Sequence, residues 1–273
     1  MMKKLVILLA FASITASASL ALAGSAAKTG VVGSWHDITY LGNAGIDGYK
    51  ADQFNRVCAF CHTPHNALPS GTVPAPLWNH AQSTVQLDPY AWASPANLAI
   101  TIYPSDPLIG PSRLCMGCHD GITAVDSHGS AGSFNGGNTP MSASYTDALG
   151  NTAKRYITDL TVTHPIGFQY AQAVSVRNVG TDTELVLPTQ GYIADNQVLA
   201  LGANFNTNNR SNLSYSSKTI NDTLYSGYLT CASCHDVHNS VNAAPAPTTT
   251  TSYNYFLYAQ EEGSAICLSC HVK

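Results

Sequence analysis

Apolar residues in this chain occur in short runs rather than in long regular stripes. Three runs that each contain two cysteines, at 49–62, 112–119 and 264–271, have the spacing of one or two helical turns. The later runs of β-type residues predict short strands: DLTVTH (159–164), ELVLP (184–188) and NQVLALG (196–202). The pattern therefore predicts a chain that is mostly coil, with short helices at the cysteine pairs and a few short strands.

The first 23 residues have the composition of a targeting segment. Met1–Lys4 carries two lysines, Leu5–Leu22 is apolar with many Ala and Ser residues, and Ala21-Leu22-Ala23 has the form of a cleavage site. A membrane anchor would be more hydrophobic. We therefore expect residues 1–23 to be a signal peptide cleaved after Ala23, with cleavage after Ala27 as the alternative. The exported protein, without a transmembrane segment, is expected outside the cell or at its surface, or alternatively in the periplasm.

Charge is sparse along the chain. Charged residues make up 10% of it and the net charge is −4, whereas about 25% of residues are charged in an average soluble protein. This balance favours neither nucleic acid nor an acidic membrane surface as a partner. Residues 24–273 are long enough for one ordinary core, and we expect them to form a single domain.

All eight cysteines fall into four CxxC pairs, and a histidine follows each pair directly. Zinc ribbons and disulfide frameworks use paired cysteines, but neither requires that histidine. CxxCH is the attachment sequence of c-type haem, in which the cysteines bind the porphyrin and the histidine is the proximal ligand of the iron. The sequence therefore predicts four covalent haems, attached to Cys58/Cys61, Cys115/Cys118, Cys231/Cys234 and Cys267/Cys270, with the proximal ligands His62, His119, His235 and His271.

The four motifs form an imperfect repeat of two pairs. One haem pair spans residues 58–119, the other spans 231–271, and a cysteine-free insert, 120–230, separates them. Four porphyrins bring a large flat apolar surface, so we expect the haems to form the core, wrapped by a chain with less regular structure than usual. The expected fold is that of an irregular multihaem cytochrome.

Each haem iron needs a second axial ligand, and histidine and methionine are the usual choices. Six histidines remain for this role. Methionine is a poor candidate, because Met1 and Met2 lie in the signal peptide, Met116 lies inside a CxxC pair, and only Met141 is left. We therefore expect two histidines on every iron.

Two of these histidines, His65 and His238, each lie three residues after a proximal histidine. Residues i and i+3 of a helical turn point to the same side, so neither histidine can reach the far face of its own haem. We expect each to ligate the second haem of its own pair, His65 the haem of Cys115/Cys118 and His238 the haem of Cys267/Cys270.

The first haem of each pair then still needs a distal ligand. His164 is the leading candidate, because Pro165 restricts the backbone beside it. His36 follows, and His80 and His128 are evenly balanced between ligand and surface residue.

The stretches VCAFCHTPHN, PLWN, LCMGCHDG, THPIGF and CASCHDVHN resemble those of the paired-CxxCH multihaem c-type cytochromes of metal-reducing bacteria. The number of motifs, the length and the N-terminal GVVGSWHD are most similar to the OmcE-type tetrahaem cytochromes, whose subunits polymerise into extracellular filaments. The resemblance covers most of the mature chain by motif order, but the insert carries no such signature. It implies subunits that borrow one axial histidine from a neighbour, and the distal ligands His36, His65, His164 and His238.

Three classes of function fit these residues: an electron conductor such as a filament subunit, an enzyme such as a multihaem reductase, and a monomeric electron shuttle. Electron transfer is favoured over catalysis, because the chain has enough histidines to close all four irons and shows no CxxCK variant. A monomeric electron shuttle would have the same ligands as a filament subunit. The expected partners are copies of this chain, other electron-transfer cytochromes and extracellular electron acceptors. His36, near the start of the mature chain, is the histidine we expect to cross a subunit interface, although an arm that folds back onto its own first haem fits nearly as well.

Overall fold

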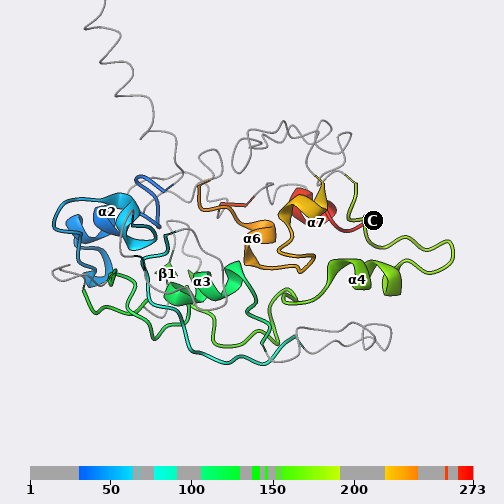
Figure 1. The fold of residues 1–273 in the computed structure, drawn as a ribbon, viewed down its shortest axis with the longest axis horizontal. Helices are drawn as coiled ribbons and strands as arrows, with labels where there is room; N and C mark the ends of the chain where they lie inside the picture. Colours follow the sequence, from blue (N-terminus) through cyan, green and yellow to red (C-terminus); the bar gives the residue numbers. More distant parts are fainter. Residues whose placement is uncertain are drawn as a thin grey trace, which may run out of the picture.

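The computed structural model describes residues 31–63, 67, 77–90, 106–129, 137–141, 145–146, 152–153, 155–190, 219–238, 256–257 and 264–272. Most of these residues are coil or turn, and the regular elements are short (Figure 1). In chain order they are α2 (Ile38–Asn43), η2 (Ile46–Gly48), η3 (Val57–Phe60), α3 (Pro111–His119), β1 (Tyr145–Thr146), β2 (Thr152–Ala153), α4 (Tyr170–Arg177), η6 (Ile220–Thr223), α6 (Cys231–Cys234) and α7 (Ala265–Leu268). Among the described residues, none of the helices is long and apolar enough to cross a bilayer.

A helical turn lies at each of the four cysteine pairs. The three cysteine-containing runs form η3, α3 and α7, as the pattern of apolar residues predicted, and α6 covers the remaining pair. Pro111 at the start of α3 suits the first helical turn, where a backbone N–H has no intrahelical acceptor. Each cysteine pair is therefore presented on a helical turn.

The strand predictions were less successful. Residues 159–164 form turns, because the Asp159 carboxylate accepts hydrogen bonds from the backbone N–H and the hydroxyl of Thr161 and so bends the chain. ELVLP contributes only an isolated bridge between Leu185 and His271. The antiparallel pair β1–β2 lies elsewhere in the insert, with Tyr145 opposite Ala153. NQVLALG lies outside the described residues.

Buried hydrophobic side chains form three small clusters among the described residues, and each cluster reaches a CxxC motif. Phe60 of the first motif packs with α2 residues such as Leu41, and Met116 of the second packs with Leu108 and Leu160. In the third cluster Cys270 is a partly buried neighbour. The motifs thus lie at the edges of several small cores, and the expectation that haems complete the core stays a prediction.

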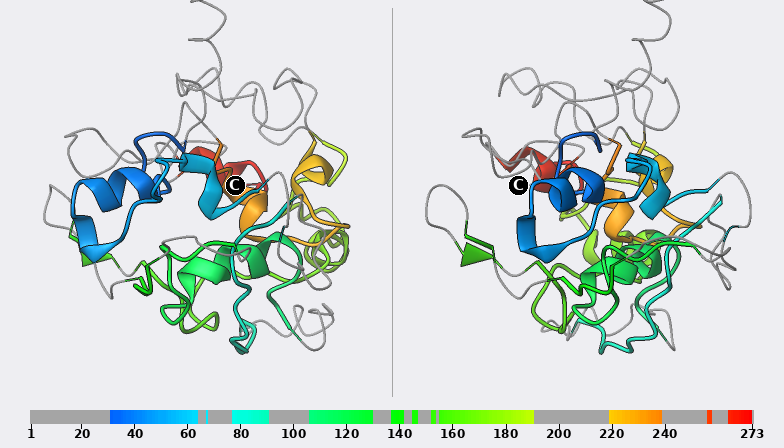
Figure 2. Two further views of the ribbon diagram at one scale, coloured as in Figure 1. Left: turned by 60° about the vertical axis from the view of Figure 1, so that its left-hand side comes forward. Right: turned by 90° about the vertical axis from the view of Figure 1, so that its left-hand side faces the viewer.

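The second and third motifs lie side by side although the insert separates them in sequence. Helix α3 packs against α6, and both views in Figure 2 show the two together (green and orange). The backbone N–H of Cys231 donates to the hydroxyl of Ser112, a fully buried residue of α3, at 3.1 Å. This contact joins the two halves of the repeat.

Candidate functional site

Three of the CxxCH motifs close the same hydrogen-bonded turn. The histidine N–H donates to the carbonyl of the first cysteine, from His62 to Cys58 at 2.8 Å, and the motifs beginning at Cys231 and Cys267 do the same at 3.0 and 2.9 Å. The other motif lies within α3. Residues four apart in a helical turn are neighbours, so each turn presents cysteine and histidine to one side. No disulfide joins any two of the eight cysteines.

The structure brings three proximal histidines each against one predicted distal histidine. The ring centres are 6.1 Å apart for His36 and His119 and 6.3 Å apart for His62 and His238. The third pair, His164 and His271, has ring centres 6.4 Å apart. Two imidazoles on opposite sides of one metal ion, each bound through nitrogen at about 2 Å, have ring centres roughly 6 Å apart. All three pairs therefore have the separation that a shared haem iron requires.

Hydrogen bonds and burial give three of these rings, His36, His119 and His164, features that favour metal binding. His119 Nδ1 lies 2.7 Å from the carbonyl oxygen of Arg155, and His164 Nδ1 lies 2.9 Å from that of Pro165. A carbonyl only accepts, so Nδ1 carries the proton in both rings and Nε2 is left for a metal. Burial, and then the charges of neighbouring histidines, lower the pKa of His36 to about 3, and burial lowers the pKa of His119. Both rings are therefore neutral at pH 7, the form that binds metals.

The pairing differs from the one expected. His238 lies beside His62 of the first motif instead of His271. His164, a candidate for the first haem of either pair, lies beside His271 of the last motif. The expectation for His238 assumed that the helical turn continues after the motif. His235 instead has an extended backbone (φ −109°, ψ 138°). The chain straightens there and carries His238 away from its own motif.

His36 also lies elsewhere than expected. Its ring lies beside His119 of the same chain and packs edge-on against Phe256, with ring centres 4.7 Å apart. His36 Nδ1 is buried. The segment is therefore folded back onto the second motif rather than the first, and the expectation that His36 crosses a subunit interface stays a prediction. His65 lies outside the described residues.

His80 and His128, the two less favoured candidates, are buried and contact protein groups. His80 Nε2 lies 3.0 Å from the carbonyl oxygen of Gly117 and 3.3 Å from Sγ of Cys118. His128 Nε2 lies 3.2 Å from a carboxylate oxygen of Asp52. These contacts give both rings a role in holding the loops around the first two motifs.

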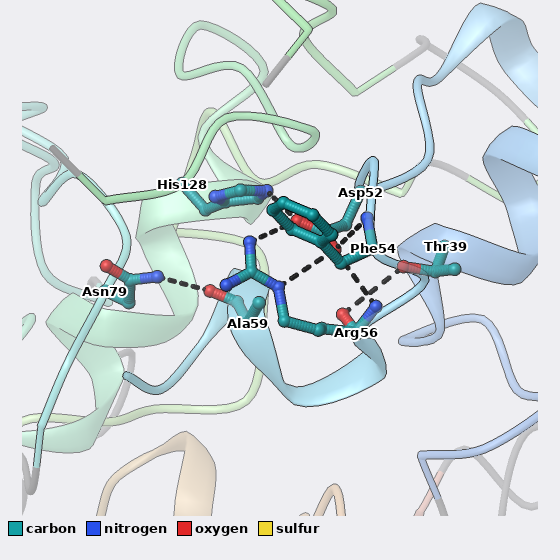
Figure 3. A network of polar contacts seen from close by, with 7 residues as sticks. All are labelled: Thr39, Asp52, Phe54, Arg56, Ala59, Asn79 and His128. Carbon is teal, nitrogen blue, oxygen red and sulfur yellow. Dashed lines mark hydrogen bonds and ion pairs between the residues drawn. The ribbon is translucent and has the colours of Figure 1, made fainter. Parts of the chain in front are cut away.

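A polar network fixes the chain just before the first motif (Figure 3). Arg56 makes a two-pronged contact with Asp52, from Nε at 3.0 Å and from Nη2 at 2.6 Å. These hydrogen bonds lower the pKa of Asp52 to about 2, although burial opposes them. The same carboxylate accepts from the backbone N–H groups of Phe54 and Arg56 and faces His128. This network was not predicted from the sequence, although the Asp–Arg spacing of four residues was an available signal.

The thiols of the second and third motifs meet where α3 packs on α6. A hydrogen bond between Cys115 and Cys231 lowers the pKa of Cys231 to about 7 and raises that of Cys115. Burial raises the pKa of the Cys61 and Cys270 thiols to about 11. The close approach places the second and third CxxC motifs, the predicted attachment points of two haems, next to each other.

Open space lies beside the first and last motifs. A cavity of about 320 Å³ is lined by Cys58, His62 and their neighbours, and one of about 250 Å³ by Cys267 and His271. Within the described part of the chain, no three His, Cys, Asp or Glu side chains converge as a bare metal ion would require. Cysteine pairs and paired imidazoles with open space beside them are a chemical set that suits haem. The CxxC cysteines would hold the porphyrins, the histidine pairs would hold the irons, and the haem would supply one-electron chemistry.

Comparison with known proteins agrees with this site. Residues 226–273 match the model of a family described as the doubled CXXCH motif. The match covers the third and fourth motifs. It supports a multihaem c-type cytochrome, and the motifs indicate covalently bound c-type haem. No curated protein matches the chain.

Proposed function

We propose that this chain transfers electrons through four covalent c-type haems, each held between two histidines. The observation that carries the proposal is the meeting of three proximal histidines with three distal ones at ring-centre separations of 6.1, 6.3 and 6.4 Å. Irons closed on both faces exchange electrons and offer no position for a substrate, so the chain is proposed to be an electron carrier and not an enzyme.

One motif and one predicted ligand remain after these three pairs. His235 is the remaining proximal histidine, and His65 is the remaining predicted distal one. We propose that His65 ligates the iron of the Cys231/Cys234 haem, in the same chain or in a neighbouring one.

The chain is further proposed to be an exported subunit of an extracellular cytochrome filament, reduced by other cytochromes and passing electrons to external acceptors. The resemblance of its motif order to OmcE-type cytochromes supports this assembly. A monomeric periplasmic or surface shuttle is the competing proposal, since its ligation would be identical.

The test is to produce the chain with the bacterial cytochrome c maturation system. Four haems per chain by pyridine haemochrome assay, and a wholly low-spin oxidised spectrum, are expected. Fewer haems, or a stoichiometric high-spin signal in intact protein, would refute the tetrahaem bis-histidine proposal. Negative-stain microscopy of secreted protein then separates the assemblies, because filaments support the subunit and monodisperse particles support the shuttle.

The variant His65→Ala tests the last ligand. Loss of filaments together with one high-spin haem per chain indicates donation between chains. Intact filaments with one high-spin haem indicate ligation within the chain. Four low-spin haems would show that His65 is not a ligand.

A further inference from the structure

Asp236 is a buried acid whose position the proposed haem ligation does not by itself explain. It follows the proximal His235 directly and is 3% exposed. Its Oδ1 accepts the backbone N–H of His238 at 3.0 Å, and its Oδ2 is buried and accepts no hydrogen bond from the described residues. The Asp236 backbone N–H donates to the carbonyl of Phe256 at 2.8 Å. The carboxylate is thus held in place, with a hydrogen bond from the described residues to only one of its two oxygens.

The ring that faces this carboxylate is a candidate haem ligand. Asp236 Oδ1 lies 3.7 Å from Nδ1 of His238, the ring that pairs with His62. His119 and His164 instead have their Nδ1 atoms against neutral backbone carbonyls. The distal ligand of the first haem is therefore set apart from these two by a negative charge behind it.

We propose that Asp236 lowers the reduction potential of the haem at Cys58/Cys61 by acting through His238. The inference rests on the proposed function, because it requires His62 and His238 to share an iron. A carboxylate beside a metal-bound imidazole holds negative charge near the iron. This negative charge stabilises the ferric over the ferrous state. Asp236 is thus a positioning and tuning residue of the third motif that acts on the haem of the first.

The size of the effect follows from the geometry. At 3.7 Å the contact is longer than a hydrogen bond, and the His238 side chain is 51% exposed, so solvent screens part of the charge. We expect removal of the charge to change the ratio of reduced to oxidised iron at a fixed potential by about threefold to tenfold. The upper end corresponds to about 59 mV for a one-electron couple.

The chain offers a matched control for this test. Asp120 follows the proximal His119 in the same way. Its carboxylate, however, accepts hydrogen bonds from the backbone N–H groups of Ile122 and Thr123 and from the Thr123 hydroxyl. Asp236→Asn and Asp120→Asn therefore remove the same charge at equivalent motif positions. Asp236→Asn removes the charge but leaves an oxygen that can accept the hydrogen bond from the backbone N–H of His238. Asp236→Glu keeps the negative charge. Asp236→Ser serves as a second neutral variant in case Asn prevents haem loading.

The experiment is a spectroelectrochemical titration of the four-haem protein. In Asp236→Asn one component should move to a more positive potential, Asp236→Glu should move back toward the wild-type value, and Asp120→Asn should not shift that component. The component belongs to the first haem if His238→Ala turns the same one high-spin. Unmoved potentials in Asp236→Asn and Asp236→Ser, or an equal shift in Asp120→Asn, would overturn the inference. Absence of four low-spin haems in the wild-type protein would instead refute the proposed function.

Discussion

In the structure a histidine from the second half of the chain lies beside a proximal histidine of the first half. Ligation between the halves makes a prediction that ligation within each half does not. Replacing His238 with Ala should open the iron attached at Cys58/Cys61, because His238 lies beside His62. Ligation within each half would instead open the iron attached at Cys267/Cys270. One haem in four should become high-spin and bind carbon monoxide when reduced, and the other three should stay low-spin.

The ring orientations identify which haem is affected. The two imidazoles are inclined by 21° in the His62–His238 pair, by 58° in the His36–His119 pair and by 75° in the His164–His271 pair. The angle between axial rings sets the splitting of the iron d orbitals, so nearly parallel rings give a less anisotropic low-spin electron paramagnetic resonance signal than crossed rings. His238→Ala should therefore remove the least anisotropic low-spin species.

Spin quantitation of the three distal variants is the measurement. His36→Ala and His164→Ala should each remove one of the more anisotropic species and leave the signal of the parallel pair intact. His80→Ala is the control. The His80 ring contacts Gly117 and Cys118, so this variant should leave all four irons low-spin. If His238→Ala kept the parallel-ring signal and lost a crossed-ring one, the pairing of the two halves would be wrong.

Three further changes test the groups around the motifs. Asp52→Asn should destabilise the folded protein by about 1–2 kcal/mol at pH 7, a range reduced for solvent screening because the Arg56 side chain is 40% exposed. This contribution is complete above the ordinary Asp pKa of 3.8 and is lost as the pH falls toward about 2, so denaturation of wild type and variant should converge in acid. Gly117→Ala should cost about 1–3 kcal/mol in thermal denaturation, since a Cβ there would lie 2.7 Å from the backbone oxygen of Ala81. His80→Ala should lower stability by about 1–3 kcal/mol in the same assay without a spectral change, because it leaves the buried Gly117 carbonyl without this donor.

The sequence predicted features that depend on local chemistry. The CxxCH spacing places cysteine and histidine on one turn, and the turns at Cys58, Cys115 and Cys267 follow from the apolar runs around them. Asp159 shows the limit of this reasoning, because one side-chain hydrogen bond to Thr161 turns a strand-like run into a bend.

The partners of the distal histidines could not be predicted in this way. They depend on the packing of α3 on α6 and on the extended backbone at His235. The spacing of residues along the chain predicts neither feature. The packing joins residues that are far apart in the chain, and the extended His235 forms a bridge with Leu257. The sequence of the insert does not indicate how the chain returns to bring the two halves together. The structure places His36, His164 and His238 beside the proximal histidines His119, His271 and His62. Their roles as haem ligands stay predictions.

The meeting of His62 with His238 has a consequence for how such a protein matures. Under the proposed ligation, a haem attached early at Cys58/Cys61 keeps an open iron until the segment around residue 238 has been exported, because its second ligand lies in the other half of the sequence. The iron of Cys267/Cys270 faces the opposite order, since His164 arrives before its motif does. Closing the first iron also closes a long loop of polypeptide, with the associated loss of chain entropy. Chains truncated within the second half should therefore accumulate with haem attached at the first motif and its iron exposed to small ligands.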